Sequence, residues 1–216
     1  MMQIKVTAPA KIHTTIQLPS SKSISNRALI INALGNGTHH PENLSDCDDT
    51  QVMIRALNDD KETIDIMAAG TAMRFLTAYL SVTPGTRIIT GTERMQQRPI
   101  QVLVNALREL GADIEYVAND GFPPLRITGR ELRKDTISLP GNVSSQYISA
   151  LLMIAPVLTN GLTIRLTRFL HYPVLRSCHF RFVYIINIYV ALVNPIMSCC
   201  IIFYNSFHTI EIPLTD

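Results

Sequence analysis

The sequence predicts an α/β fold, in which short strands alternate with helices that each bury one face. Two observations support this. Several segments combine an apolar strand, a polar turn and a helix with a periodic apolar stripe, and this order returns along the chain. The chain also has 216 residues, 47% of them hydrophobic, which is enough to bury a sizeable core.

The first half of the chain begins with a strand that runs into a Pro-Ser turn and a helix. In order, we expect a strand over 15–18, a helix over 28–34, a helix that follows a cap at 46–50, a strand over 63–66 and a helix over 72–80. Met53, Ile54 and Leu57 would form the buried face of the second helix.

The second half contains the clearest helix of the chain. Its apolar stripe is Ile100, Leu103, Val104, Leu107 and Leu110. Pro99 suits its first helical position, and Gly111 ends it. Around it we expect a strand over 86–90, a turn over 91–98, strands over 114–117, 125–128 and 136–140, and a helix with Ile148, Leu151, Leu152 and Ala155 on its buried face.

The strand–turn–helix segments resemble one another in sequence. Residues 15–19 (TIQLP) return as 136–140 (TISLP), and Ser23 then aligns with Ser144. A further copy begins at residue 63 and a looser one at residue 86. Irregular spacing argues against a solenoid, so the copies predict duplicated units within one α/β domain.

The segment 18–27 (LPSSKSISNR) predicts an anion site. Unpaired N–H groups at a helix start attract anions, and Lys22 and Arg27 add positive charge about one turn apart. The alternative is a serine cap flanked by surface charges. The segment lacks the glycines of a P-loop, and Gly35 and Gly37 follow a helix, so nucleotide binding is not supported.

Four blocks, in order, resemble the 5-enolpyruvylshikimate-3-phosphate (EPSP) synthase family. They are residues 18–29 (LPSSKSISNRAL), 69–74 (AGTAMR), 93–100 (ERMQQRPI) and 141–147 (GNVSSQY). The resemblance as a whole extends from about residue 4 to residue 167. The resemblance implies an incomplete enolpyruvyl transferase-like α/β domain of repeated βαβαββ units, six of which form two domains in complete members. This chain would retain two units and part of a third, and lack the second domain.

The resemblance also implies an activity. The family transfers the enolpyruvyl group of phosphoenolpyruvate to the 5-hydroxyl of shikimate 3-phosphate and releases phosphate, a step of the shikimate pathway toward chorismate and aromatic amino acids. The two substrates carry four anionic groups, which require many cationic and N–H donors. The family implies no cofactor or metal, a cytoplasmic location, and a monomer when full length.

Site residues follow from the matched motifs. Lys22 would contact both substrates and act in proton transfer. Shikimate 3-phosphate would be held by Lys22, Ser23, Arg27, Ser144, Ser145 and Gln146, and phosphoenolpyruvate by Lys22, Gly70, Arg98 and Gln146. Gly70 would let the backbone approach its ligand closely. Helix capping by the serines, and an exposed surface charge at Arg98, are the structural alternatives.

The sequence departs from the family at single positions and at its end. Ala68 stands where the family usually has Asn, and Phe75 where it usually has Pro, so Phe75 is expected to alter packing behind Thr71. From about residue 168 the composition changes: no glycine follows Gly161, and no Asp, Glu, Lys or Arg lies between Phe182 and Ile210.

We therefore divide the chain into residues 1–167, a partial enolpyruvyl transferase domain, and 168–216, an aberrant hydrophobic tail. A frameshift or premature stop is the favoured explanation of the tail. A membrane anchor and a native strand-rich segment are the alternatives, although the apolar run is shorter than a bilayer span. The chain is then expected to have little or no turnover.

Composition argues against other classes. A net charge of +2 with no basic run gives no nucleic-acid footprint. The first residues lack the apolar region of a signal peptide, and only Cys47 precedes the tail, so neither a membrane partner nor a disulfide framework is expected. The remaining alternatives are a UDP-N-acetylglucosamine enolpyruvyl transferase and an inactive anion-binding remnant.

Overall fold

The computed structural model describes residues 19–36 and 41–167, together with the backbone of 209–212. The expected strand over 15–18 and most of the segment 168–216 lie outside the described residues. In chain order the elements are α1 (Lys22–Leu34), α2 (Asp48–Asn58), β1 (Thr63–Asp65), α3 (Gly70–Val82), β2 (Gly85–Thr90), α4 (Glu93–Gln96), α5 (Gln101–Leu110), β3 (Asp113–Tyr116), β4 (Leu125–Gly129), β5 (Thr136–Pro140), α6 (Ser145–Ile154), the 3₁₀ turn η1 (Ala155–Val157), β6 (Leu162–Thr167) and β7 (Thr209–Ile212).

The elements from β1 to β4 form one complete βαβαββ unit. β1 and β2 are parallel and are joined through α3, whereas the hairpin of β3 and β4 places β4 antiparallel to β2. The resulting sheet order is β1-β2-β4-β3. The expected α/β class and repeating unit are confirmed, because β5, α6 and β6 begin the same pattern again with a parallel strand pair.

The backbone of Thr209–Ile212 adds β7 to the second sheet. It pairs antiparallel with β6, so the described sheet has the order β5-β6-β7. The sequence analysis does not predict this strand. The pairing gives β6 backbone partners on both of its edges, β5 on one and β7 on the other.

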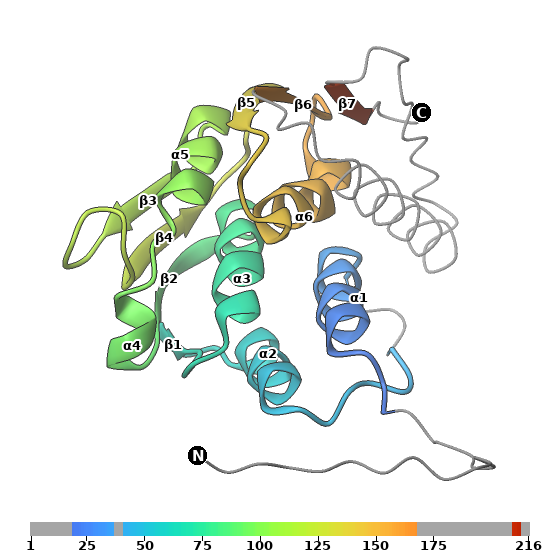
Figure 1. The fold of residues 1–216 in the computed structure, drawn as a ribbon, viewed down its shortest axis with the longest axis vertical. Helices are drawn as coiled ribbons and strands as arrows, with labels where there is room; N and C mark the ends of the chain where they lie inside the picture. Colours follow the sequence, from blue (N-terminus) through green and yellow to red (C-terminus); the bar gives the residue numbers. More distant parts are fainter. Residues whose placement is uncertain (1–18, 37–40, 168–208, 213–216) are drawn as a thin grey trace, which may run out of the picture.

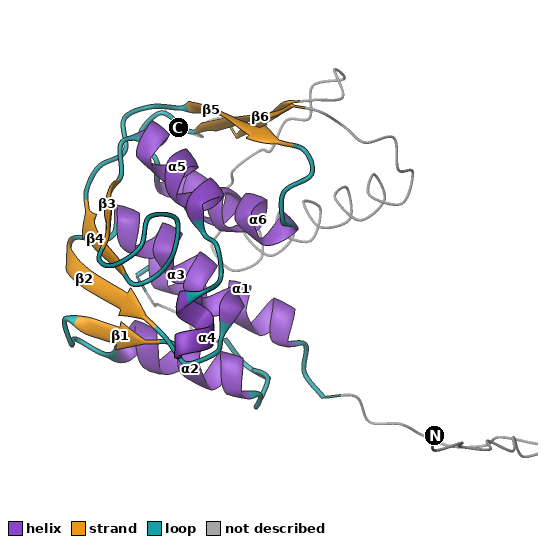
Figure 2. Ribbon diagram, turned by 60° about the vertical axis from the view of Figure 1, so that its left-hand side comes forward, coloured by secondary structure: helices purple, strands orange, loops and turns teal. Residues whose placement is uncertain are grey.

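Helix α3 is the centre of the packing. One side lies against β2 and β4, and the others against α1, α2, α5 and α6 (Figures 1 and 2). It is accordingly buried along almost its whole length, including Phe75 and Leu76 at 0% exposure. Two of its buried hydroxyls are satisfied within the helix, since Thr77 and Ser81 donate to the carbonyls of Met73 and Thr77.

Several predicted boundaries are correct and others are wrong: the helix expected over 28–34 begins at Lys22, and Ala155 lies just beyond α6. The stripe of α5 is buried, and Gly111 ends the helix with a left-handed φ of 111°. Pro99, however, is not the first helical residue: Ile100 is the N-cap, because its N–H donates to the Gly121 carbonyl and so belongs to the preceding loop. The segment expected as a turn over 91–98 contains the short helix α4, capped by Thr92.

The end of β4 packs closely onto the end of α3. A Cβ added at Gly129 would overlap the carbonyl oxygen of Thr83 and lie 2.7 Å from that of Leu80. Both neighbours are backbone atoms, which cannot move aside as a flexible side chain can. Gly129 therefore sets how closely the sheet approaches its central helix.

We predict that Gly129→Ala lowers the free energy of unfolding by about 2 kcal/mol or more, because the added methyl separates β4 from α3. Gly111→Ala is the matched control. A Cβ there meets nothing within 4 Å, so only the left-handed backbone is penalised, at about 1 kcal/mol. Urea unfolding of both variants measures the difference, and equal losses would contradict the packing argument.

Candidate active site

Helices α1, α2, α3 and α6 begin near one another. The Gln146 amide donates to the Thr71 hydroxyl at 3.2 Å, and these are the second residues of α6 and α3. Lys22, the first residue of α1, pairs with Asp49 in the first turn of α2. Thr50, next to Asp49 in α2, donates to Asn26 of α1, and Arg27 of α1 donates to Ser149 of α6. These contacts near the helix starts bring several N–H-rich ends together.

A serine cap and an ion pair fix the start of α1. Ser21 is the N-cap, and its hydroxyl accepts from the Ile24 N–H at 3.4 Å. The Lys22 ammonium lies 2.9 Å from Asp49 Oδ2, with the lysine side chain 46% exposed. Lys22 is therefore accessible but already paired with a carboxylate. Asp49 is a partner that the sequence analysis missed.

Arg27 lies deeper than Lys22, among α1, α3 and α6. Its Nη1 donates to the Ser23 carbonyl at 2.7 Å and its Nη2 to the Ser149 hydroxyl at 3.3 Å. Its guanidinium carbon lies 5.0 Å from the centre of the Phe75 ring, at cation–π distance. Burial lowers the pKa of Arg27 to about 10, so the group remains charged at neutral pH.

The Phe75 ring, expected to disturb the packing behind Thr71, is fully buried at 0% exposure. It fills part of the interface between α1 and α3 and forms one face of the Arg27 environment. At this position the chain therefore supports a cation with an aromatic ring.

Arg74 and Arg98 converge on Gly70, and we call this pair the guanidinium cluster. A Cβ at Gly70 would lie 2.6 Å from Arg98 Nη1 and 3.0 Å from Arg74 Nη1. Arg74 also donates to the Gly70 carbonyl at 2.7 Å. The absence of a side chain at Gly70 is thus what admits both cations to the start of α3.

The guanidinium cluster has no acidic partner in the described part of the chain. The ion pairs found there involve Lys22, Lys61, Arg87, Arg130 and Arg133 instead. In addition, Arg74 Nε is buried without a hydrogen-bond partner among these residues. Two like charges held together with an unused donor are suited to an oxyanion.

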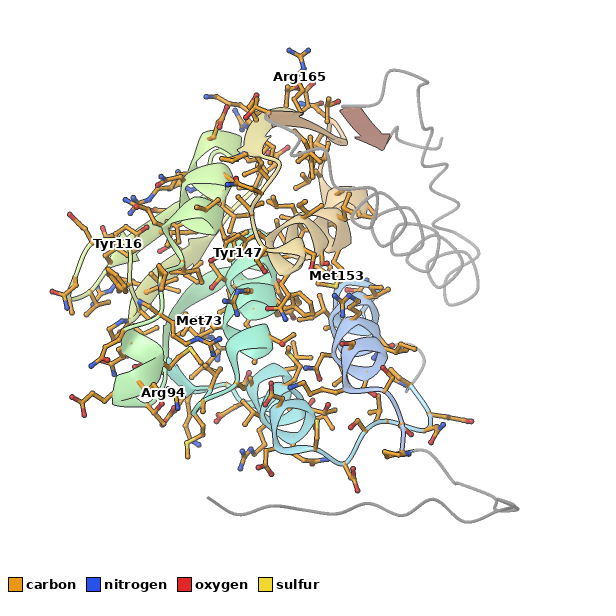
Figure 3. The ribbon with its side chains drawn as sticks, viewed as in Figure 1. Met73, Arg94, Tyr116, Tyr147, Met153 and Arg165 are labelled. Carbon is orange, nitrogen blue, oxygen red and sulfur yellow. The ribbon has the colours of Figure 1, made fainter. Side chains whose placement is uncertain are left out.

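The start of α6 faces the guanidinium cluster. Ser144 is the N-cap and accepts from the Gln146 N–H at 3.3 Å, so it does cap the helix as the structural alternative supposed. Ser145 follows it and is exposed. Tyr147, which Figure 3 labels at the start of α6, places its ring 5.4 Å from the guanidinium carbon of Arg74.

The structure thus brings the expected residues into two adjoining groups. Gly70, Arg98 and Gln146 lie around the start of α3, where Gln146 bonds to Thr71. Lys22, Ser23 and Arg27 lie at the start of α1, and Arg27 reaches α6 through Ser149. Arg74 and Tyr147 lie within the matched motifs, but the motifs gave neither residue a role. The contact between the Arg74 guanidinium and the Tyr147 ring joins segments that are far apart in sequence, so a local periodic pattern cannot reveal it.

Cys47, the N-cap residue of α2, lies near Lys22 in the group at the start of α1. Partial desolvation acts to raise the pKa of its thiol, but hydrogen bonds with Ser45 and Thr50 and the nearby charge of Lys22 together lower the pKa.

Within residues 19–36 and 41–167 no group of side chains has the composition of a metal site. No helix in the described part of the chain is long and apolar enough to cross a membrane.

Comparison with solved structures defines the class of fold. An EPSP synthase structure from Acinetobacter baumannii superimposes with a TM-score of 0.67 at 19% identity, covering 93% of this chain and 47% of that one. At this identity the likeness concerns the fold alone. It is an enolpyruvyl transferase fold of which this chain contains part.

Sequence comparison then defines the family. The family model of EPSP synthase (3-phosphoshikimate 1-carboxyvinyltransferase) matches residues 6–59 and 58–178, and the chain belongs to this family. A 3-phosphoshikimate 1-carboxyvinyltransferase of Bacteroides fragilis is 74% identical over 166 residues, which cover 77% of this chain and 40% of that protein. One from Vibrio atlanticus is 41% identical over 182 residues, covering 72% of this chain and 43% of the relative. The chain therefore spans less than half the length of these relatives.

We predict that Asp49→Asn changes the free energy of unfolding by less than about 1 kcal/mol, because the Lys22 pair is partly exposed. Asp48→Asn is the matched control, since it removes the same charge from the same helix turn without an ion pair among the described residues. Urea unfolding at low and high salt measures both. A loss of several kcal/mol specific to Asp49→Asn would show that the pair is instead a major stabilising contact.

Proposed function

We propose that this chain carries the part of an EPSP synthase that binds phosphoenolpyruvate and shikimate 3-phosphate at the starts of α1, α3 and α6. The observation that carries the proposal is the convergence of Arg74 and Arg98 on Gly70, without an acidic partner in the described part of the chain. The family membership supplies the reaction: transfer of the enolpyruvyl group to the 5-hydroxyl of shikimate 3-phosphate, with release of phosphate.

Each group of residues has a proposed role. Gly70, Arg98 and Gln146 would hold phosphoenolpyruvate, with Lys22 reaching it from α1. Ser23, Arg27, Ser144 and Ser145 would hold shikimate 3-phosphate together with Lys22 and Gln146, because its two anionic groups require donors from more than one helix. The arrangement supports this division, because Gln146 and Arg27 connect the neighbouring helices and would keep the two ligands adjacent.

Lys22 is proposed as a proton-transfer group. In the reaction the methylene carbon of phosphoenolpyruvate gains a proton and the 5-hydroxyl attacks the adjacent carbon, giving a tetrahedral intermediate. Loss of phosphate, with a proton leaving the new methyl group, then restores the double bond. The Asp49 contact would hold the Lys22 ammonium at the start of α1, where it remains partly exposed to a ligand.

We further propose that the chain binds its substrates weakly and turns them over little. The family resemblance assigns a carboxylate base and additional Lys and Arg ligands to the part of the relatives that this chain does not span. Binding to the residues present is separable from turnover, since preorganised cations attract anionic ligands without completing the catalytic set.

The division at about residue 167, and the origin of residues 168–216 in a frameshift, remain our proposals. Resequencing the encoding DNA across codons 160–216 tests them: another frame that restores family sequence supports a frameshift, whereas confirmation of the present frame overturns it. A cytoplasmic monomer as the full-length form is likewise proposed from the family alone.

We predict that Arg98→Gln weakens phosphoenolpyruvate binding at least about ten-fold, because it removes a charge-assisted contact. Arg94→Gln is the matched control: Arg94 is exposed on α4, has no recorded ion pair in the described structure, and carries the same charge. Isothermal titration of phosphoenolpyruvate, with shikimate 3-phosphate present, measures both variants.

The same titration separates the alternatives. Binding of UDP-N-acetylglucosamine in preference to shikimate 3-phosphate would identify the sister enolpyruvyl transferase instead. Binding of phosphate without selectivity for either substrate would indicate an anion-binding remnant. Substantial turnover by the purified 216-residue protein would contradict the proposal of low activity.

A further inference from the structure

Tyr147 touches both segments that bring cations to Gly70. Its hydroxyl donates to the Pro99 carbonyl at 3.0 Å, next to Arg98 in the chain. The face of its ring lies against the Arg74 guanidinium, 5.4 Å from the ring centre. The side chain is 8% exposed, so both contacts are largely shielded from water.

The segment that carries Arg98 is fixed at three points. The Arg98 N–H donates to the Met95 carbonyl at 3.0 Å, and the Ile100 N–H donates to the Gly121 carbonyl at 2.9 Å. Between them Pro99 has no N–H to donate, so its carbonyl is the group through which it can be held. The Tyr147 hydroxyl bonds to that carbonyl and ties the segment to α6.

The position of the Arg98 side chain depends on its backbone, because this side chain makes no ion pair within the described part of the chain. The residue is exposed, and two guanidinium groups repel each other. A long exposed side chain also loses conformational entropy when it is confined. When the adjacent backbone is fixed in advance, less conformational entropy is lost as the ligand binds.

We propose that Tyr147 is a positioning residue that holds Arg98 and Arg74 together over Gly70 for one oxyanionic group. The hydroxyl sets the backbone beside Arg98, and the ring sets the guanidinium of Arg74. This inference rests on the proposed function, in that the anion would be a phosphate or carboxylate group of phosphoenolpyruvate. It assigns Tyr147 a role that acts through the two arginines without contact with the substrate.

The test is Tyr147→Phe in the 216-residue protein, which removes the hydroxyl and keeps the ring. We expect phosphoenolpyruvate binding to weaken about three- to ten-fold, the size expected for one lost hydrogen bond. The affinity for shikimate 3-phosphate should change less than about two-fold. Tyr147 is proposed to act through Arg74 and Arg98, and neither is a proposed ligand of shikimate 3-phosphate. Titration with each ligand separately measures this split.

Tyr116→Phe is the matched control. Tyr116 also carries an arginine on its ring, with the Arg108 guanidinium carbon 4.8 Å from the ring centre, but it lies on β3. Its hydroxyl is buried with no hydrogen-bond partner in the described structure. This substitution should leave the affinity for phosphoenolpyruvate unchanged.

A double-mutant cycle distinguishes positioning from a general structural effect. If the hydroxyl acts through Arg98, Tyr147→Phe has no further effect on phosphoenolpyruvate binding once Arg98→Gln is present. A structural role would weaken binding by the same factor in both backgrounds. Phenylglyoxal labelling, followed by mass spectrometry, should also show faster modification of Arg98 in Tyr147→Phe without any ligand.

The outcomes separate this inference from the proposed function. Unchanged phosphoenolpyruvate affinity in Tyr147→Phe, or full additivity in the cycle, overturns the positioning role and leaves the proposed function standing. If the unmodified chain binds shikimate 3-phosphate but not phosphoenolpyruvate, the inference fails and the shikimate 3-phosphate part of the proposed function remains. If it binds neither, both fail.

Discussion

The packing of α3 is the constraint on which the rest of the structure depends. The helix lies between the four-stranded sheet and helices α1 and α6, and its buried surface leaves little choice in where its ends lie. Gly129 fixes its carboxyl end closely against β4, where backbone meets backbone. Because the helix is rigid, fixing that end and the packed middle also fixes where its first residue, Gly70, stands.

The candidate site follows from the direction of this helix. A crossover between parallel strands places the start of its helix at the carboxyl edge of the sheet, where ligands of open α/β sheets bind. Both α3 and α6 lie in such connections, each at the carboxyl edge of its own sheet, and the hydrogen bond from Gln146 to Thr71 joins the two helix starts. Gly70 then leaves room for the ends of two arginine side chains, which an added Cβ would displace.

Sequence patterns predicted most elements of this fold because the patterns are local. The apolar stripe of α5 and the glycine that ends it lie within one turn or two of each other, and both were confirmed. Pro99 shows the limit: its residue type suited a helix start, but a hydrogen bond from Ile100 to Gly121 places the boundary later. That bond joins residues 21 positions apart (121 − 100), which no local propensity reveals.

The same contrast between local sequence motifs and contacts of distant residues applies to the candidate site. Motif resemblance singled out Lys22, Arg27, Gly70 and Arg98, and the structure brings them into adjoining groups. The residues that hold them were not predicted, because Asp49, Phe75 and Tyr147 act across the fold. The Tyr147 and Pro99 contact spans 48 positions and joins the start of α6 to the segment before α5.

The four cations differ in what compensates their charge, and this difference indicates where a ligand would be held most directly. Asp49 balances Lys22, while a carbonyl, a hydroxyl and the Phe75 ring contact Arg27. Burial lowers the pKa of Arg27 to about 10, which leaves the group charged at neutral pH. Arg74 has a carbonyl and an aromatic face but retains a buried unpartnered Nε, and Arg98 has no acidic partner in the described structure. Bringing two such groups together is electrostatically unfavourable in the unliganded protein, and an oxyanion between them would reverse the sign of that interaction. The repulsion at Gly70 is therefore the strongest physical reason to expect an anion to bind there first.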